Sequence, residues 1–452
     1  MGGIRIPLAT VTRVKEAVRS PQLLSWTKIL TRFLSLEALV QGLTFACGIL
    51  IVRALPKADY ALFTLANTMQ ATMNLMADNG IGSGITAIGG RVWQDRFRFG
   101  QLITTAMRLR RAFAIISVTL VTPLLFWMLL RNGGSVSYSA LITAAVLLGF
   151  YFQLTLGVLM PVPRLHLEVN RIQNLNVWST ALRLILLVIA YGLFLKTSNS
   201  IFLNTAIVML AAAVSLGFQE IILRRWVPAM ADPQAPPNEN DRREILNIVR
   251  AQAPNSIYYC VQSQLTVWLI SVFGSVTGVA EVGALGRIAV IFAMLASVMG
   301  NVIYPRFARV QETRLLWRRY WQILGGHAAL ALMVLAFTVA WPEALLWVLG
   351  PKYAHLQREL FLMMLSAVMF SILGCMWQLN VARGWIVSPW LMIPTGVAAQ
   401  VILILLLDVS KVRGVLLLNI YSMVPGFFLN LLRTRQGIRE FASSYAHQRS
   451  NV

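Results

Sequence analysis

The sequence predicts an all-α integral membrane protein with about twelve transmembrane helices, arranged as two six-helix lobes with both termini in the cytoplasm. Three observations lead to this prediction. Hydrophobic residues make up 57% of the 452 residues and charged residues only 12%, about half the charged share of an ordinary soluble domain. About twelve apolar windows are long enough to cross a hydrocarbon core. A long polar stretch divides these windows six and six.

Each predicted span is a stretch of about 20 mostly apolar residues, the length at which an α-helix crosses a core of about 30 Å. A helix satisfies its own backbone in lipid, and the sequence lacks the short alternating strands of a β-barrel. The predicted spans of the first half are 33–54, 60–88, 111–130, 139–160, 171–195 and 201–223. Those of the second half are 254–273, 279–303, 319–341, 358–382, 386–407 and 412–432.

The net charge of +22 is explained mainly by membrane topology. With the N-terminus in the cytoplasm, 29 of the 39 lysines and arginines fall in cytoplasmic segments and 8 in outer loops. This distribution follows the positive-inside rule, and it counts Arg110 among the cytoplasmic residues. The basic balance therefore gives no reason to expect nucleic-acid binding.

The longest polar stretch, residues 224–254, contains five prolines and separates the sixth span from the seventh. Two short matches, "ADYALF" with "AEVGAL" and "RRAF" with "RRYW", indicate that the two halves are a duplication with a cleft between the lobes. The predicted parts are a basic cytoplasmic N-terminal segment (1–32), an N-terminal lobe (33–223), a cytoplasmic linker (224–253), a C-terminal lobe (254–433) and a cytoplasmic tail (434–452).

A short polar stop, "RALPKADYALF" at residues 53–63, separates the first two spans. Pro56 should end the first span, because proline disfavours helix in the residue before it. Asp59 is expected to cap the next helix, and Tyr60 to lie at the depth of the membrane interface. The stretch therefore predicts a hairpin turn between two antiparallel helices.

Ionisable residues inside predicted spans are costly and mark functional sites. Four stand out here: Glu37, Asp78, Arg183 and Arg287. Guanidinium groups suit phosphate oxygens, so the two arginines could hold a diphosphate. Alternatively, they pair with the two acids or with helix-end carbonyls and hold the lobes together. The acids are candidates for ion coupling, for substrate contact or for structural pairing.

Neutral amides inside the spans are candidates for sugar contacts, because sugar hydroxyls need both donors and acceptors. The candidates are Gln173, Asn174, Asn176 and Gln262. An uncompensated amide in lipid is unfavourable, so each should face either a wet cleft or another helix.

Two other features are expected to be structural. The three cysteines all fall in apolar spans without metal-ligand spacing, so neither a metal site nor a disulfide framework is predicted. Gly80, Gly82 and Gly84 are expected to permit close packing or bending of a membrane helix rather than to cradle a phosphate.

Three stretches occur in the order found in a known family. "GILIVRALPKADYALFTLANTMQATMNLMADNGIGSGITAI" resembles the first two helices of bacterial polysaccharide flippases of the multidrug/oligosaccharidyl-lipid/polysaccharide exporter superfamily. "LGRIAVIFAMLASVMGNVIYPRFARV" is similar to the eighth helix of that family, and "LLWVLGPKYAHLQREL" to the turn before its tenth.

The resemblance implies a protein of the bacterial cytoplasmic (inner) membrane that serves O-antigen or exopolysaccharide synthesis. It would move a polyprenyl-diphosphate-linked oligosaccharide from the inner to the outer leaflet by alternating access. No bond would be made or broken, so no enzyme activity is expected. The implied partners are membrane lipids, the lipid-linked glycan, and glycan polymerase and export machinery. No cofactor is implied, and coupling to a proton or a sodium ion stays open.

Two alternatives remain. A multidrug cation extruder of the same superfamily would favour cavity carboxylates without cavity arginines. A membrane glycan polymerase or ligase would be expected to carry a long outer loop with catalytic groups. The longest outer loop, near 342–357, is short, and His355 is its only candidate catalyst.

Overall fold

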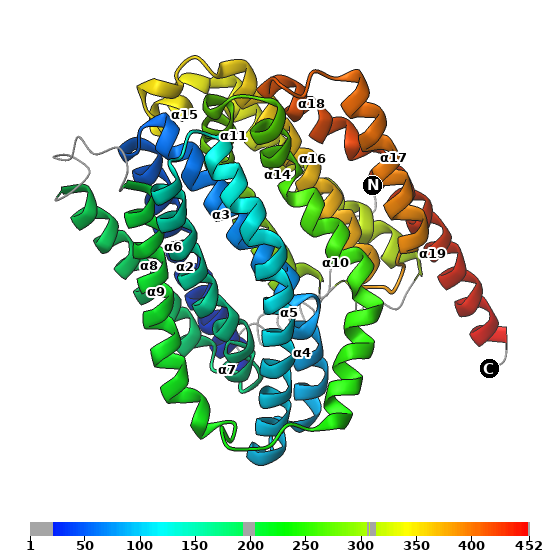
Figure 1. Cartoon of the computed structure of the whole chain (residues 1–452). Helices are drawn as coiled ribbons and strands as arrows, with labels where there is room; N and C mark the ends of the chain where they lie inside the picture. Colours follow the sequence, from blue (N-terminus) through cyan, green and yellow to red (C-terminus); the bar gives the residue numbers. More distant parts are fainter. Residues whose placement is uncertain (1–20, 193–203, 305–306, 308–312, 451–452) are drawn as a thin grey trace, which may run out of the picture.

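The computed structural model describes residues 21–192, 204–304, 307 and 313–450, and these residues form helices and no strand, as predicted (Figure 1). The expected N-terminal segment 1–32 lies largely outside the described residues. The first half contains α2 (Pro21–Ala54), α3 (Lys57–Asp78), α4 (Ile81–Val92), α5 (Arg96–Arg131), α6 (Val136–Leu159), α7 (Pro161–Leu165), α8 (Val169–Ala190), α9 (Asn204–Trp226) and η2 (Val227–Ala229). The second half contains α10 (Glu239–Phe273), α11 (Val276–Ile288), α12 (Ile291–Val298), the π-helical η3 (Met299–Ile303), α14 (Thr313–Ala340), α15 (Pro342–Leu349), η4 (Pro351–Tyr353), α16 (Gln357–Val381), α17 (Pro389–Leu406), α18 (Val412–Ser422) and α19 (Val424–Ser450).

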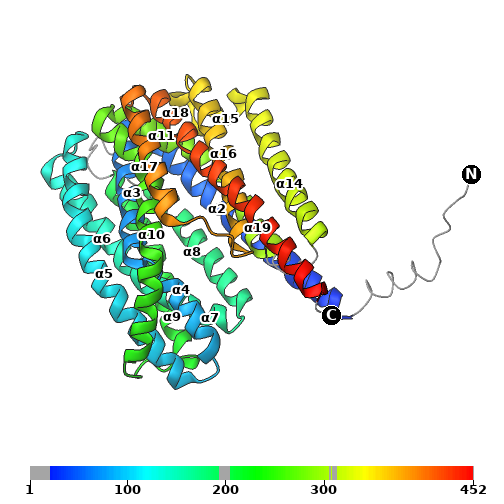
Figure 2. The same ribbon diagram turned by 90° about the vertical axis from the view of Figure 1, so that its right-hand side faces the viewer.

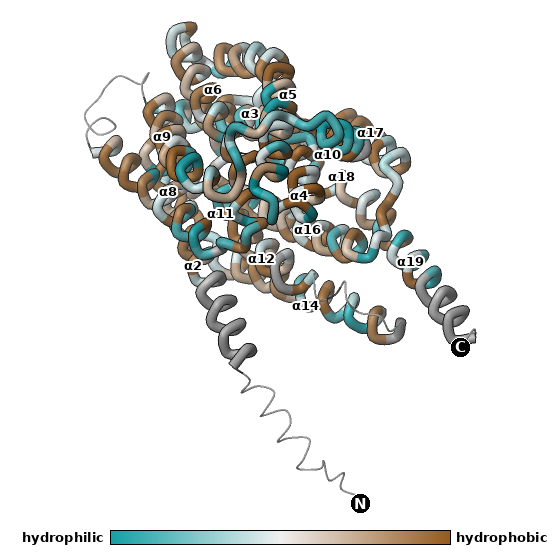
Figure 3. The backbone as a smooth tube through the Cα atoms, turned by 90° about the horizontal axis from the view of Figure 1, so that it is seen from below, coloured by the Kyte–Doolittle hydropathy of each residue, from teal (hydrophilic) through white to brown (hydrophobic). Residues whose placement is uncertain are grey.

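Within the described residues, nine helical stretches are long and apolar enough to cross a membrane, and the α11–α12 pair, bent by 42°, makes a tenth if it is one span. Large apolar side chains are more than half exposed on the outside, such as Ile115 and Leu120 of α5 and Leu405 of α17, as expected of lipid-facing surfaces. Figure 3 shows hydrophobic residues on the peripheral helices α8 and α17. The chain is a multi-pass membrane protein; the count of twelve spans and the side of the termini stay predictions.

The α3 helix is not among those nine, although it belongs to the predicted span 60–88. It lies inside the bundle against α5, α6, α10 and α11, and fourteen of its 22 residues are buried. A helix surrounded by other helices places its polar side chains against protein rather than lipid, so a lower apolar content is tolerated there.

The predicted span 60–88 is broken into α3 and α4. Asn79 and Gly80 both adopt the left-handed conformation, with φ angles of 36° and 95°. Glycine reaches such angles without steric cost, which agrees with the bending role expected of this glycine-rich stretch. The break ends α3 at Asp78 and redirects the chain into α4.

Helix α10 joins the two lobes (Figures 1 and 2). Residues 239–253, expected as linker, form its first turns and pack against α4 and α5. There Asp241 pairs with Arg98, and Ile245 lies so close to Gly84 that a Cβ on the glycine would be 3.2 Å away. The rest of α10 packs against α3, α11, α17 and α18.

The hydrophobic cores differ between the two ends of the molecule. At the end that carries α15, called here the α15 end, one core contains residues of both lobes, including Leu55 and Tyr60 with Val279 and Leu349. At the opposite end, called the α7 end, one core contains residues of the first half with Ile245 and Val249 of α10, and a second core contains only residues after α10. The lobes are therefore joined at the α15 end and packed separately at the α7 end (Figure 1).

The polar stop at residues 53–63 is a hairpin turn, as predicted, because α2 ends at Ala54 and α3 begins at Lys57. The role expected of Asp59 is wrong. Asp59 makes no cap; it is buried, and its Oδ2 accepts a hydrogen bond from Asn204 Nδ2 of α9 (3.2 Å). Tyr60 is fully buried within the protein, and its depth in the membrane stays a prediction. Both are covered because α9 and the other lobe pack over this turn.

Basic side chains fasten the two lobes at the α15 end. Arg53 Nε donates to the carbonyl of Val348 (2.8 Å), and Lys352 Nζ donates to the carbonyl of Arg53 (3.1 Å). Each cation thus caps the C-terminal carbonyls of a helix in the other lobe. Lys57 and Glu281 add an ion pair across the same boundary (3.3 Å). We call Arg53, Lys57, Glu281 and Lys352 the α15-end latch.

Candidate functional site

Arg183 of α8 and Arg287 of α11 belong to two helices that both pack against α2. A Cβ on Gly48 of α2 would be 3.2 Å from Cδ of Arg287. The structure therefore places two arginines that are far apart in the chain on helices that share α2 as a neighbour.

The surroundings of the two arginines contain no described counter-charge. Arg287 Nε donates to Tyr60 Oη (3.4 Å), and its guanidinium lies over the ring of Phe63 (5.6 Å). Arg183 Nε is buried and has no hydrogen-bond partner. Among the residues with described side chains, no carboxylate lies within 4.0 Å of either guanidinium.

The two acids considered as partners for these arginines are engaged elsewhere. Asp78 Oδ1 accepts from Arg110 Nη1 (2.8 Å). Glu37 accepts from Gln41 Nε2 (3.1 Å) and from Gln173 Nε2 (3.3 Å). The interpretation that Arg183 and Arg287 pair with Asp78 or Glu37 is therefore wrong.

Arg110 is the residue that the sequence analysis missed. It was counted in a cytoplasmic segment, but α5 begins at Arg96 and its Arg110 is buried. Its Nη2 also donates to Asn74 Oδ1 (2.9 Å), and it reaches across to α6, where a Cβ on Gly157 would overlap the guanidinium. The sequence contains one signal that could have indicated Arg110. Asp78 is an acid inside a predicted span, and such an acid requires a cation on a neighbouring helix.

The Arg110–Asp78 pair lies in the wall of a cavity of about 830 Å³ within the N-terminal lobe. Helices α3, α4, α5, α6 and α7 line it, and we call it the N-lobe cavity. Its polar lining residues are Asn74, Asp78, Ser83, Thr86, Arg110, Gln153 and Arg164.

The amides predicted on α8 do not share one surface. Gln173 is buried against α2, where it meets Glu37. Asn176 Oδ1 accepts from Gln219 Nε2 of α9 (2.8 Å), and Asn174 is exposed. Gln173 and Asn176 thus contact neighbouring helices, the alternative that the sequence left open.

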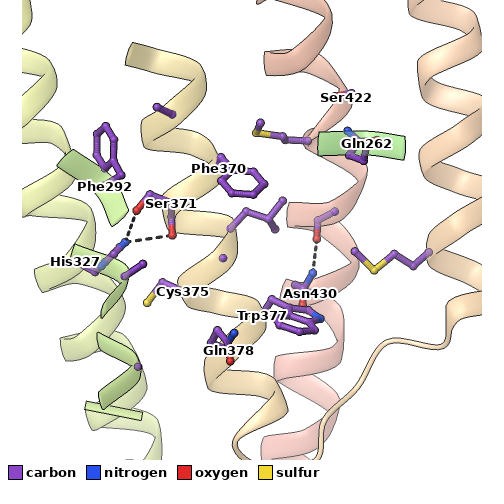
Figure 4. A pocket seen from close by; sticks show the side chains of 18 of the residues that line it. Gln262, Phe292, His327, Phe370, Ser371, Cys375, Trp377, Gln378, Ser422 and Asn430 are labelled. Carbon is purple, nitrogen blue, oxygen red and sulfur yellow. Dashed lines mark hydrogen bonds between the residues drawn. The ribbon is translucent and has the colours of Figure 1, made fainter. Parts of the chain in front are cut away.

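Gln262 lies in a different cavity, of about 900 Å³, inside the C-terminal lobe (Figure 4). Its Oε1 accepts from Gln400 Nε2. On another wall, His327 Nε2 lies 3.1 Å from the carbonyl oxygen of Ser371. The lining is mostly apolar and includes the aromatic side chains of Phe292, Phe370 and Trp377. We call it the C-lobe cavity.

The outer-loop residue considered as a catalyst has a structural contact. His355 Nε2 lies 3.2 Å from Glu281 Oε1, beside the α15-end latch. In the described part of the chain, no group of three or more His, Cys, Asp or Glu residues could hold a metal ion.

The comparisons with known proteins give similarity at the level of the fold. No family model and no curated protein matches the chain. An inward-facing MATE family transporter of the MOP superfamily gives a TM-score of 0.63 at 15% identity, over 89% of this chain and 96% of that one. An outward-facing MATE family transporter gives 0.54 at 14% identity, over 90% and 94%. The chain has the MATE fold.

A further match is a MOP superfamily transporter from Pyrococcus furiosus, described as having a binding pocket of reverse polarity. It gives a TM-score of 0.54 at 14% identity, over 91% of this chain and 94% of that one.

The fold is compatible with the superfamily expected from the sequence, while the superfamily and the polysaccharide flippase subtype stay predictions.

Proposed function

We propose that the protein is an alternating-access transporter that moves a polyprenyl-diphosphate-linked oligosaccharide across the bacterial inner membrane. The observation that supports an anionic substrate is the pair Arg183 and Arg287, on two helices that pack against α2, without a described carboxylate partner. Both residues are partly buried, and a charge inside a membrane protein is unfavourable without a partner of opposite charge. A bound diphosphate would supply two negative groups, and guanidinium forks bind phosphate oxygens well.

The location of the pair suits transport rather than chemistry. Arg183 belongs to the N-terminal lobe and Arg287 to the C-terminal lobe, so an anion held by both would bridge the lobes. A rocking motion of one lobe against the other changes the surroundings of such a site without any covalent step. The residues only have to neutralise and hold the headgroup.

A multidrug cation extruder is the second candidate. The fold comparisons favour it, because the similar structures are described as multidrug resistance MATE transporters. The aromatic, mostly apolar C-lobe cavity also suits a lipophilic molecule. The arginine pair opposes it, since two guanidinium groups repel an organic cation.

Reconstitution of the full-length protein in liposomes tests both candidates. We expect flipping of a fluorescent short-chain polyprenyl-diphosphate saccharide, and we expect Arg183→Ala and Arg287→Ala each to slow it by about tenfold or more, the loss of one charged hydrogen bond. Lysine variants should recover only part of the rate, because the bidentate fork is lost. The control is Arg108→Ala, which alters an exposed arginine of α5.

The two candidates predict opposite outcomes in the same liposomes. If the protein flips no diphosphate lipid and instead expels a lipophilic cation, the flippase proposal is wrong and the multidrug candidate replaces it. If both alanine variants flip the lipid at the rate of the control, the arginine pair is not the anion site.

A further inference from the structure

We infer that the N-lobe cavity binds the neutral saccharide part of the substrate, at a site separate from the arginine pair. The inference rests on the proposed function for the identity of the ligand. Helix α3 runs between the two sites: Tyr60 contacts Arg287, and Asp78 lies in the cavity wall. These two residues are 18 positions apart on α3, about 27 Å along the helix axis. The two sites can therefore be altered independently.

The charges of the cavity favour a neutral ligand. Asp78 and Arg110 are paired at 2.8 Å in its wall, so an added anion would meet the carboxylate and an added cation would meet the guanidinium. Arg164 adds a further charge, but its side chain is exposed. A hydroxyl group is compatible with both signs, because it can donate to a carboxylate and accept from an N–H group.

Several polar groups of the lining have hydrogen-bonding capacity left. Arg110 is bonded to Oδ1 of Asp78, and the Asp78 side chain is 33% exposed while that of Arg110 is only 3% exposed. The Nε of Arg110 and the Oε1 of Gln153 are buried without a hydrogen-bond partner. Ser83 is exposed in the lining. A ligand rich in hydroxyl groups matches this mixture of donors and acceptors.

The fold constructs this cavity from specific local features. Gly157 leaves room on α6 for the guanidinium of Arg110 to reach α3. The left-handed turn at Gly80 separates α4 from α3, so that Ser83 and Thr86 of α4 line the cavity together with Asp78. About half of the cavity surface is polar, and polar groups inside a membrane lobe are unfavourable unless the site is wet or occupied.

The test measures binding to the full-length protein in nanodiscs. The probes are short-chain polyprenyl diphosphates that carry glucose, galactose or N-acetylglucosamine, and the same lipid without sugar. The test variant is Gln153→Met with Ser83→Ala, which leaves the Arg110–Asp78 pair in place. The matched control is Gln322→Met with Ser137→Ala, two exposed residues outside the cavity lining.

We expect the unmodified protein to bind at least one sugar-bearing lipid more tightly than the bare lipid. The test variant should weaken that binding by about tenfold, the loss of two neutral hydrogen bonds, and leave binding of the bare lipid unchanged. If the test variant weakens binding of the sugar-bearing lipid and the bare lipid equally, or weakens neither, the saccharide site is wrong. The proposed function still stands in that case if Arg183→Ala weakens binding of both lipids. If the unmodified protein binds none of the lipids, the proposed function fails and the saccharide site fails with it.

Discussion

Arg110 and Asp78 form an ion pair whose two members are buried to very different extents. Water reaches the carboxylate but hardly reaches the guanidinium. Removing the charge of Asp78 therefore leaves a buried cation without its counter-charge, while removing Arg110 leaves an acid that solvent can still stabilise. The two single substitutions should not be equivalent.

Asp78→Asn should lower the free energy of unfolding by about 3 kcal/mol, because it leaves the buried cation of Arg110 without its counter-charge. Arg110→Met should cost less, and the double variant should resemble Arg110→Met rather than the sum. Thermal unfolding followed by tryptophan fluorescence in detergent measures the difference. Arg111→Met, at the exposed neighbouring position, is the control. Equal losses in the two single variants would contradict the assignment.

The sequence predicted one member of this pair and missed the other. Asp78 is recognisable because it lies inside an apolar span. Arg110 precedes the apolar window 111–130, and only the structure shows that α5 starts at Arg96, fourteen residues before Arg110. Lateral packing of α3 against α5 decides that these two residues meet, and hydropathy contains no information on which helices are neighbours. For the same reason Arg183 and Arg287 could be nominated but not brought together.

At the scale of elements, the break between α3 and α4 depends on a backbone conformation that only one residue type adopts freely. Gly80 has φ 95° and ψ 1°, where a Cβ is strained by about 1–2 kcal/mol. Gly90, on the same helix α4, is exposed and a Cβ there would meet nothing within 4 Å. These two glycines make a matched pair.

Gly80→Ala should lower the free energy of unfolding by about 1–2 kcal/mol, because alanine is strained at this angle. Gly90→Ala should be neutral or raise it by up to about 1 kcal/mol, because alanine is the better helix former. Thermal unfolding of both variants under identical conditions measures the contrast. Equal effects would show that the left-handed turn does not depend on glycine.

Helix limits were predicted well where apolar composition defines them and less well where it does not. The turn around Pro56 separates α2 from α3 as expected. The start of α10 was expected as linker because residues 239–253 are polar. In the structure, the side chain of Asn238 caps this helix by accepting from the backbone of Asn240 and Asp241, and packing on α4 and α5 holds it there.

At the scale of the whole molecule, the division into two six-helix lobes stays a prediction from the polar stretch between the spans, and the end at which the two halves share a core could not be predicted. The joining depends on a core shared across the boundary at the α15 end and on the α15-end latch. In the latch, Arg53 and Lys352 bind helix carbonyls that no sequence pattern identifies. The latch should therefore control how often this end opens.

Arg53→Ala combined with Lys352→Ala should shift the equilibrium toward molecules that are open at the α15 end by about tenfold, the loss of charge-assisted bonds in a partly exposed setting. Spin labels at Ser137→Cys and Ala354→Cys, both exposed at this end, report the distance between the lobes. Arg358→Ala, another exposed basic residue, is the control. An unchanged distance distribution would mean that the shared core alone keeps this end closed.

The core shared at only one end makes each lobe a lever. Helix α5 contains 36 residues and is about 54 Å long, so a rotation of about 10° around a pivot at the α15 end displaces its far end by roughly 9 Å, from helix length alone. Arg287 contacts Tyr60, in the first turn of α3 and near this pivot. Arg110, in the wall of the N-lobe cavity, lies 21 residues from the α15 end of α5, about 31 Å along the helix, and would move by roughly 5 Å. While the α15 end stays closed, a headgroup held by the arginines would hardly move during the swing that displaces the N-lobe cavity.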